Sequence, residues 1–207
     1  SLQRWSFDTQ EAGVVPPGFE VLETAGAGSP ATWGVVGDPA APSGGKGFGI
    51  LHTANRGQTY NVALAPDVQA TDVELTVSLK AGTGEQDQGG GLVWRANGAR
   101  DYYVARWNPL EKNVRFYVVV GEQRSAFKAA DIDLDPTRWH SMRVIADHAR
   151  AASFLVAAGV HHDDFISPGH AFEALLDVGL LVVADDDDAE CWLAFLAHAR
   201  PKRINGC

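Results

Sequence analysis

The sequence predicts an all-β fold, a sandwich of short antiparallel strands. Short segments with alternating apolar and polar residues recur along the chain, and Gly-, Pro- and Asn-containing turns separate them about every 8 to 12 residues. No segment has the 3.6-residue period of a helix of ordinary length. We therefore expect a single domain over residues 1–207, with 199–207 as a frayed tail.

The individual strands follow from these runs in chain order. The clearest run is 72–80, where Val73, Leu75, Val77 and Leu79 alternate with polar residues, so that one face is buried and one is wet. A uniformly apolar run at 178–184 predicts a central buried strand. The predicted strands are 19–22, 33–36, 48–52, 60–64, 72–80, one around 92–95, 101–107, 113–120, 125–129, 132–134, 139–146, 152–156, 178–184 and 191–198, with one helical turn at 170–176.

The segments 101–107 and 113–120 form the hairpin around which the chain is organised. Alternation assigns Tyr103, Ala105, Trp107, Val114, Phe116, Val118 and Val120 to the core face. The opposite, exposed face then carries Tyr102, Val104, Arg106, Asn113, Arg115 and Tyr117. Arg106 and Arg115 are predicted to lie almost opposite each other, which favours an acidic side chain or a ligand between them.

An Arg/aromatic face is the main candidate for a binding site. Aromatic rings stack on the C–H faces of sugars, and arginines donate hydrogen bonds to hydroxyls or carboxylates. The alternative is an ordinary solvated face on which the arginines pair with acidic residues, and both interpretations remain open. The candidate ligand-binding residues are Arg95, Tyr102, Arg106, Arg115, Tyr117, Trp139 and Arg143.

Composition and charge exclude some classes of partner. The net charge of −9 argues against nucleic acid, because phosphate binding requires a basic face. No apolar run approaches the roughly 20 residues that span a bilayer. The two cysteines, Cys191 and the terminal Cys207, say little about the compartment of the protein. The oligomeric state is not predicted.

No motif predicts a cofactor or a catalytic residue. The DDDD run at 185–188 could bind Ca²⁺, but it lacks EF-hand spacing and a solvated turn is favoured. The HHDD run at 161–164 supplies only part of a zinc site. His140 is in phase with Met142 and is interpreted as a core-edge residue. No run of paired carboxylates predicts glycoside hydrolysis, and no phosphate-loop pattern surrounds the glycines at 89–91. We expect no metal and no cofactor.

Several motifs resemble a known superfamily. The series GLVWR, DYYVARWNPLEKNVRFYVVVGEQR and LDPTRWHSMRV is similar to bacterial laminin-G-like and concanavalin A-like jelly rolls, which include the 3-keto-disaccharide hydrolase group. The resemblance covers residues 1–146. It implies a concanavalin A-like jelly-roll β-sandwich of two antiparallel sheets, a concave face suited to sugars, and an extracytoplasmic (periplasmic or secreted) location.

Three hypotheses about function follow. The first is a carbohydrate-binding, lectin-like domain with a concave Arg/aromatic groove. The second is a glycoside-hydrolase-like enzyme acting on a (keto-)sugar or oligosaccharide. The third is a structural or protein-interaction module that uses the same surface.

Overall fold

The computed structural model describes residues 3–66, 68, 70, 72–85, 87–147, 150–158, 181–185 and 192–194 of the chain. This part of the chain contains strands and no helix. The strands are β1 (Glu20–Thr24), β2 (Gly28–Gly37), β3 (Lys46–Asn55), β4 (Tyr60–Leu64), β5 (Val73–Lys80), β6 (Gly90–Asn97), β7 (Asp101–Asn108), β8 (Asn113–Val120), β9 (Gln123–Asp131), β10 (His140–Asp147), β11 (Arg150–Ala158), β12 (Leu181–Asp185) and β13 (Trp192–Ala194).

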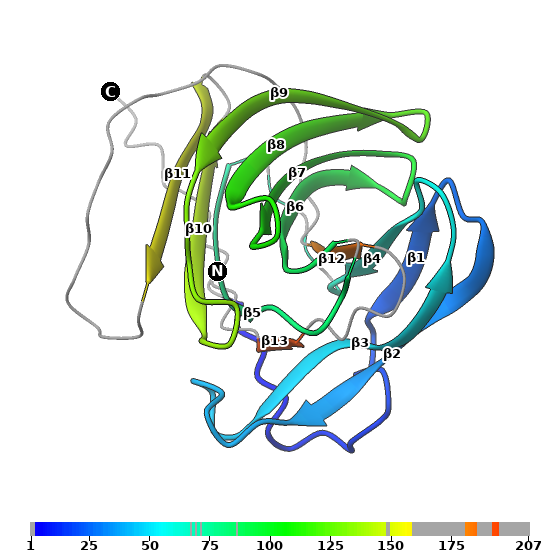
Figure 1. Cartoon of the computed structure of the whole chain (residues 1–207), viewed down its shortest axis with the longest axis vertical. Helices are drawn as coiled ribbons and strands as arrows, with labels where there is room; N and C mark the ends of the chain where they lie inside the picture. Colours follow the sequence, from blue (N-terminus) through cyan, green and yellow to red (C-terminus); the bar gives the residue numbers. More distant parts are fainter. Residues whose placement is uncertain are drawn as a thin grey trace.

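The strands form two sheets, in which neighbouring strands pair antiparallel. The front sheet has the order β1-β4-β12-β6-β7-β8-β9, and the back sheet has the order β11-β10-β5-β13-β3-β2. In the view of Figure 1, strands β6 to β9 lie above β5, β13 and β3. The two sheets meet where β5 and β10 approach β6.

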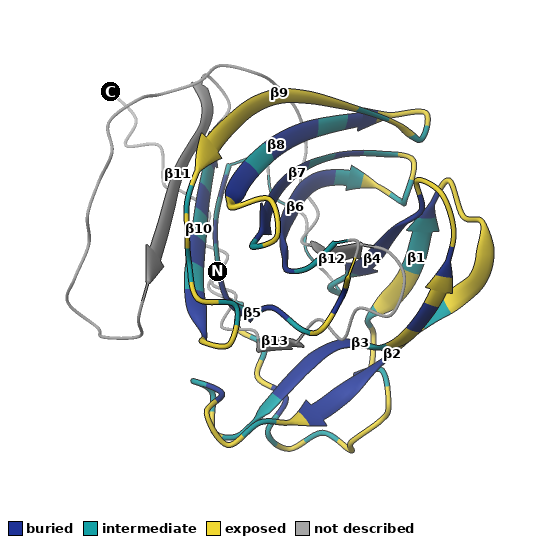
Figure 2. Cartoon of the chain, viewed as in Figure 1, coloured by how far each residue is buried: buried dark blue, intermediate teal, exposed yellow. Residues whose placement is uncertain are grey.

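The main core fills the space between the two sheets. The alternation in β5 places Val73, Leu75, Val77 and Leu79 in this core, each at most 2% exposed. From the front sheet, Leu92 and Trp107 point into the same core. Figure 2 shows the resulting pattern, with buried central strands and a largely exposed β9 at the edge of the front sheet.

The central hairpin has the predicted register. Arg106 pairs with Arg115, and Trp107 pairs with Val114. The predicted core face is confirmed for Trp107, Val114 and Phe116. It is wrong for Val120, which is 63% exposed because it lies at the very end of β8.

One predicted strand is absent from the structure. Residues 125–129 belong to the longer β9, but 132–134 form no strand. The backbone N–H of Ile132 donates to the carbonyl oxygen of Lys112 at 2.8 Å, and Ile132 and Leu134 pack against the core instead of pairing. Their apolar side chains therefore pack an irregular segment against the core and do not indicate a strand.

Some predictions fall outside the described residues. These are the helical turn at 170–176, the tail at 199–207, and both cysteines, Cys191 and Cys207. The predicted strands at 178–184 and 191–198 are represented by β12 and β13. Within the described residues, no helix has the length and apolar character needed to cross a membrane.

Candidate functional site

The outer face of the front sheet carries a second apolar cluster. Its residues alternate with those of the main core, as the two-residue period of a strand requires. None of them is more than 5% exposed. The members are Tyr60, Val62, Val93, Tyr102, Val104, Tyr117 and Val119, from β4, β6, β7 and β8.

A hydrogen bond shows that the front sheet curls toward this face. The hydroxyl groups of Thr24 on β1 and Tyr102 on β7 lie 2.8 Å apart. These strands are separated by four inter-strand spacings, which would place them about 19 Å apart in a flat sheet. Two side chains, one of them a short threonine, cannot bridge that distance. The sheet is therefore strongly curved, and the face that points away from the main core is its concave face.

Arg124 spans the same curled face. Its guanidinium carbon lies 3.7 Å from the ring centroid of Tyr60 and 4.5 Å from that of Tyr117. Tyr60 belongs to β4 and Tyr117 to β8, again four spacings apart. In Figure 1 the end of β1 and the β6–β7 turn come together at the right, in agreement with the bond that Thr24 donates to the Ala99 carbonyl.

The predicted exposure of this face is therefore wrong for its two tyrosines, although Arg115 is 39% exposed. Tyr102 is 3% exposed and Tyr117 is 5% exposed. Their rings fill the inside of the curl and contact other side chains, so they offer no open platform for a ligand. A flat sheet would have left them in solvent.

A group of polar residues lies on the same face at the turn end of the β7–β8 hairpin. Arg106 Nη1 lies 3.2 Å from Asp87 Oδ1, and Arg106 Nη2 lies 2.7 Å from Glu111 Oε2. The other oxygen of Glu111 lies 3.6 Å from Arg115 Nη1. The side-chain amide of Asn108 donates to Asp87. We call Asp87, Arg106, Asn108, Glu111 and Arg115 the Glu111 cluster.

The local sequence explains how these side chains are placed. Glu111 lies in the turn between β7 and β8, where the Leu110 N–H donates to Asn108 Oδ1 at 3.0 Å. Asp87 lies in the loop before β6. The glycines that follow let β6 lie close against β7, because a Cβ at Gly91 would be 1.7 Å from the Ala105 carbonyl oxygen. A Cβ at Gly89 would likewise be 2.3 Å from the Trp107 carbonyl oxygen, so these close approaches explain the glycines at 89 and 91.

The members of the cluster differ in exposure. The side chain of Arg106 is 4% exposed and that of Asp87 is 24% exposed, whereas Glu111 and Arg115 are 36% and 39% exposed. Burial raises the pKa of Asp87 above its ordinary value, although the charge of Arg106 opposes this shift. Arg115 and Glu111 are therefore the members that solvent or a ligand reaches.

Asn113 adds an unused acceptor beside the cluster. It is the cross-strand partner of Asn108 and is 6% exposed. Its Oδ1 atom has no hydrogen-bond partner within the described residues. A buried oxygen of this kind needs a donor from water or from a bound molecule.

The seven predicted site residues do not form one surface. Arg95, Tyr102, Arg106, Arg115 and Tyr117 belong to the front sheet, whereas Arg143 lies on β10 in the back sheet and Trp139 immediately precedes that strand. The reason is that β10 pairs with β5 and not with the central hairpin.

The other three predicted residues are buried or paired within the fold. Arg95 is 8% exposed and has a positive φ of 57°, where the β6–β7 register shifts. Trp139 is buried, and its Nε1 donates to Asp38 at 3.0 Å. Arg143 pairs with Glu74 at 2.8 Å.

The sequence analysis did not name Asp87, Asn108, Glu111 or Asn113 as candidate site residues. For Glu111 a signal existed, because it lies in the turn that joins the two strands carrying Arg106 and Arg115. Asp87 lies in a loop whose approach to Arg106 depends on the packing of β6, so no local pattern indicates it.

The described residues contain no group of three or more His, Cys, Asp or Glu side chains that could hold a metal ion. The HHDD run at 161–164 and residues 186–188 of the acidic run lie outside the described residues. His140 is buried at the edge of the core, with its Nε2 2.7 Å from the Asp135 carbonyl oxygen and its ring edge-on to Trp107, which confirms the structural interpretation.

The fold is similar to that of known solved structures. One is the carbohydrate-binding module CBM66 from Bacillus subtilis, with 14% identity and a TM-score of 0.59 over 86% of this chain and 92% of that chain. Another is the exoplasmic/lumenal domain of VIP36. Its Ca²⁺/Man3GlcNAc-bound form has 10% identity and a TM-score of 0.50 over 84% of this chain and 87% of that chain. Its metal-free form has 11% identity and a TM-score of 0.50 over 88% and 90%.

These similarities, at low identity, concern the fold. They confirm the predicted concanavalin A-like jelly-roll sandwich of two antiparallel sheets. No protein-family model matches the chain, and no curated protein sequence matches it.

Proposed function

We propose that this chain is a carbohydrate-binding domain whose ligand contacts the curled face of the front sheet at the Glu111 cluster. The observation that carries the proposal is the half-exposed pair of Arg115 and Glu111 on that face. A guanidinium donor beside a carboxylate acceptor matches a sugar hydroxyl, which both donates and accepts.

The known structures of the same fold support this proposal. One is described as a carbohydrate-binding module, and the other was obtained in a Man3GlcNAc-bound form. We also infer an extracytoplasmic location, in keeping with the exoplasmic/lumenal origin of the VIP36 domain and with the sequence resemblance.

The proposed roles of the predicted arginines differ. Arg115 contacts the ligand, whereas buried Arg106 holds Asp87 and Glu111 in position. We expect Tyr102 and Tyr117 to shape the curled face without stacking on the sugar, since both rings are buried.

One observation favours a second candidate, a glycoside-hydrolase-like enzyme. Asp87 and Glu111 share Arg106, and burial raises the pKa of Asp87. Two carboxylates in different environments are the usual acid and base of such enzymes.

A glycan array combined with a hydrolysis assay on the same glycans tests the proposal. Binding without turnover supports a carbohydrate-binding domain. Turnover that is lost in Asp87→Asn and Glu111→Gln supports the enzyme. Neither binding nor turnover would refute both and leave the protein-interaction module.

A further inference from the structure

The Glu111 cluster balances its own charges. Its two carboxylates, Asp87 and Glu111, are matched by the two guanidinium groups of Arg106 and Arg115. An anionic ligand could gain a full ion pair with Arg115 only by competing with Glu111. An uncharged ligand leaves the balance intact.

The atoms available to a ligand are mainly acceptors. Glu111 contributes the most exposed carboxylate oxygens of the cluster, and Asp87 contributes less exposed ones. A carboxylate or sulfate has no hydrogen to donate and would face these oxygens unfavourably. A hydroxyl group can donate to them.

Among the members of the cluster, the more exposed guanidinium donors belong to Arg115. Its contact with Glu111 is 3.6 Å, too long for a hydrogen bond, whereas Arg106 contacts the same carboxylate at 2.7 Å. The tight Arg106 contact fixes the carboxylate, and the loose contact leaves Arg115 donors beside a Glu111 acceptor. Two adjacent hydroxyls of one sugar ring fit such a pair, one accepting and one donating.

We propose that the Glu111 cluster selects uncharged saccharides, by taking a vicinal diol between the Arg115 guanidinium and the Glu111 carboxylate, and disfavours sugars that carry carboxylate or sulfate groups. This inference rests on the proposed function. The raised pKa of Asp87 is consistent with it, because burial already disfavours the ionised form of this carboxyl and a nearby anion would disfavour it further.

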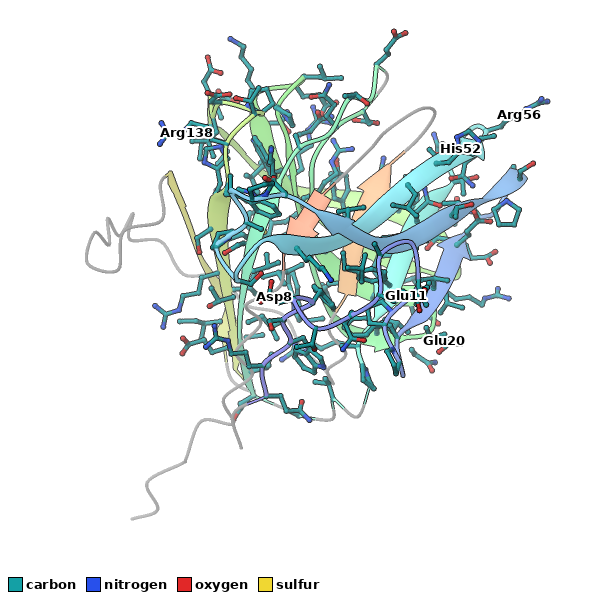
Figure 3. The ribbon with its side chains drawn as sticks, turned by 90° about the horizontal axis from the view of Figure 1, so that it is seen from below. Asp8, Glu11, Glu20, His52, Arg56 and Arg138 are labelled. Carbon is teal, nitrogen blue, oxygen red and sulfur yellow. The ribbon has the colours of Figure 1, made fainter. Side chains whose placement is uncertain are left out.

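The test is binding to immobilised polysaccharides in two groups. The neutral group contains glucan, mannan, galactan, xylan and fructan, and the acidic group contains polygalacturonan, alginate, hyaluronan and heparin. We expect binding to at least one neutral polysaccharide, at least about tenfold weaker binding to every acidic one, and a loss of at least about tenfold in Arg115→Ala. Arg56→Ala is the matched control, because Arg56 is exposed at the far end of β3, as Figure 3 shows.

Glu111→Gln provides a second readout. Removal of the carboxylate charge should weaken neutral binding and raise the relative binding of acidic polysaccharides. Preference for acidic polysaccharides by the unmodified protein would overturn the inference and leave the proposed function standing. Neutral binding unchanged in Arg115→Ala would overturn the inference and also the placement of the ligand at the Glu111 cluster. No binding to any polysaccharide would overturn both the inference and the proposed function.

Discussion

Arg106 on β7 and Arg115 on β8 are direct cross-strand partners, and the carboxylate of Glu111 lies between their guanidinium groups. Like charges in this position destabilise a strand pair by roughly 0.2–1 kcal/mol. The sequence predicted the pairing and left open whether an acid or a ligand separates the charges. The acidic side chain of Glu111 occupies that position. The two arginines differ in exposure, since the side chain of Arg106 is 4% exposed and that of Arg115 is 39% exposed.

Arg106→Ala and Arg115→Ala should have different effects on stability. Arg106 is buried and its removal leaves the partly exposed carboxylates of Asp87 and Glu111 without their main partner, so we expect a loss of about 1–3 kcal/mol in the free energy of unfolding. Arg115 is 39% exposed, so its removal should cost less than about 1 kcal/mol. Urea denaturation of both variants measures the difference, and equal losses would contradict it.

Glu111→Gln should lower stability by about 1–3 kcal/mol, because it removes a charged hydrogen-bond partner of Arg106 and the screening between the two arginines. Thermal melts at low and high salt check this. Added salt should reduce the loss, since it screens the exposed part of the repulsion. The control is Glu20→Gln, an exposed glutamate labelled in Figure 3, which should melt like the unmodified protein. If Glu111→Gln had the same melting temperature as Glu20→Gln, the bridging role of Glu111 would be refuted.

The central hairpin was predictable because its signals are local. Strong alternation places Trp107 and Phe116 in the core, and the turn at 109–112 sets the register of the two strands. The exposure of the opposite face was not predictable. The curl depends on contacts such as Thr24 with Tyr102, 78 residues apart, which leave no local pattern.

The difference between local and long-range signals also explains why the predicted site residues lie on two different sheets. Trp139 was grouped with the hairpin because aromatic residues beside arginine suggest a binding face. Its partner is Asp38, 101 residues away, on the loop that joins β2 and β3. The order of strands within a sheet decides which faces meet, and that order is set by packing of the whole chain.

The Thr24–Tyr102 contact gives a test of the curl. Thr24 donates its one hydroxyl hydrogen to the Ala99 carbonyl at 2.7 Å, so Tyr102 must donate to Thr24. Tyr102→Phe should therefore cost about 1–2 kcal/mol, and Thr24→Val should cost more, because it leaves both partners unpaired. Thr24→Ser keeps the hydroxyl and is the matched control. Equal stability of all three variants in urea would show that this contact does not hold the curl.

Gly91→Ala should disrupt the approach of β6 to β7. The added Cβ would lie 1.7 Å from the Ala105 carbonyl oxygen, which requires a backbone shift and should cost about 3 kcal/mol or more. At Gly37, where nothing lies within 4 Å of the added Cβ, alanine should change stability by less than about 1 kcal/mol. Differential scanning calorimetry of the two variants compares them. A Gly91→Ala variant as stable as Gly37→Ala would contradict the close approach.

Asp87 should make stability depend on pH in an identifiable direction. Burial raises its pKa above the ordinary value of 3.8, so the folded state binds this proton more tightly than the unfolded state. The contribution of Asp87 to the free energy of unfolding therefore increases as pH falls through the folded-state pKa, and it is complete below 3.8, where both states are protonated.

Comparison with Asp87→Asn isolates this effect, because the other carboxylates titrate in both proteins. We expect the stability of the unmodified protein relative to Asp87→Asn to rise as the pH is lowered from about 7 to about 4, in urea denaturation at fixed ionic strength. Asp131→Asn, an exposed carboxylate on β9, is the control for loss of one surface charge. A difference between the unmodified protein and Asp87→Asn that stays constant, or shifts toward the variant at low pH, would mean that the Arg106 ion pair outweighs burial and keeps Asp87 ionised.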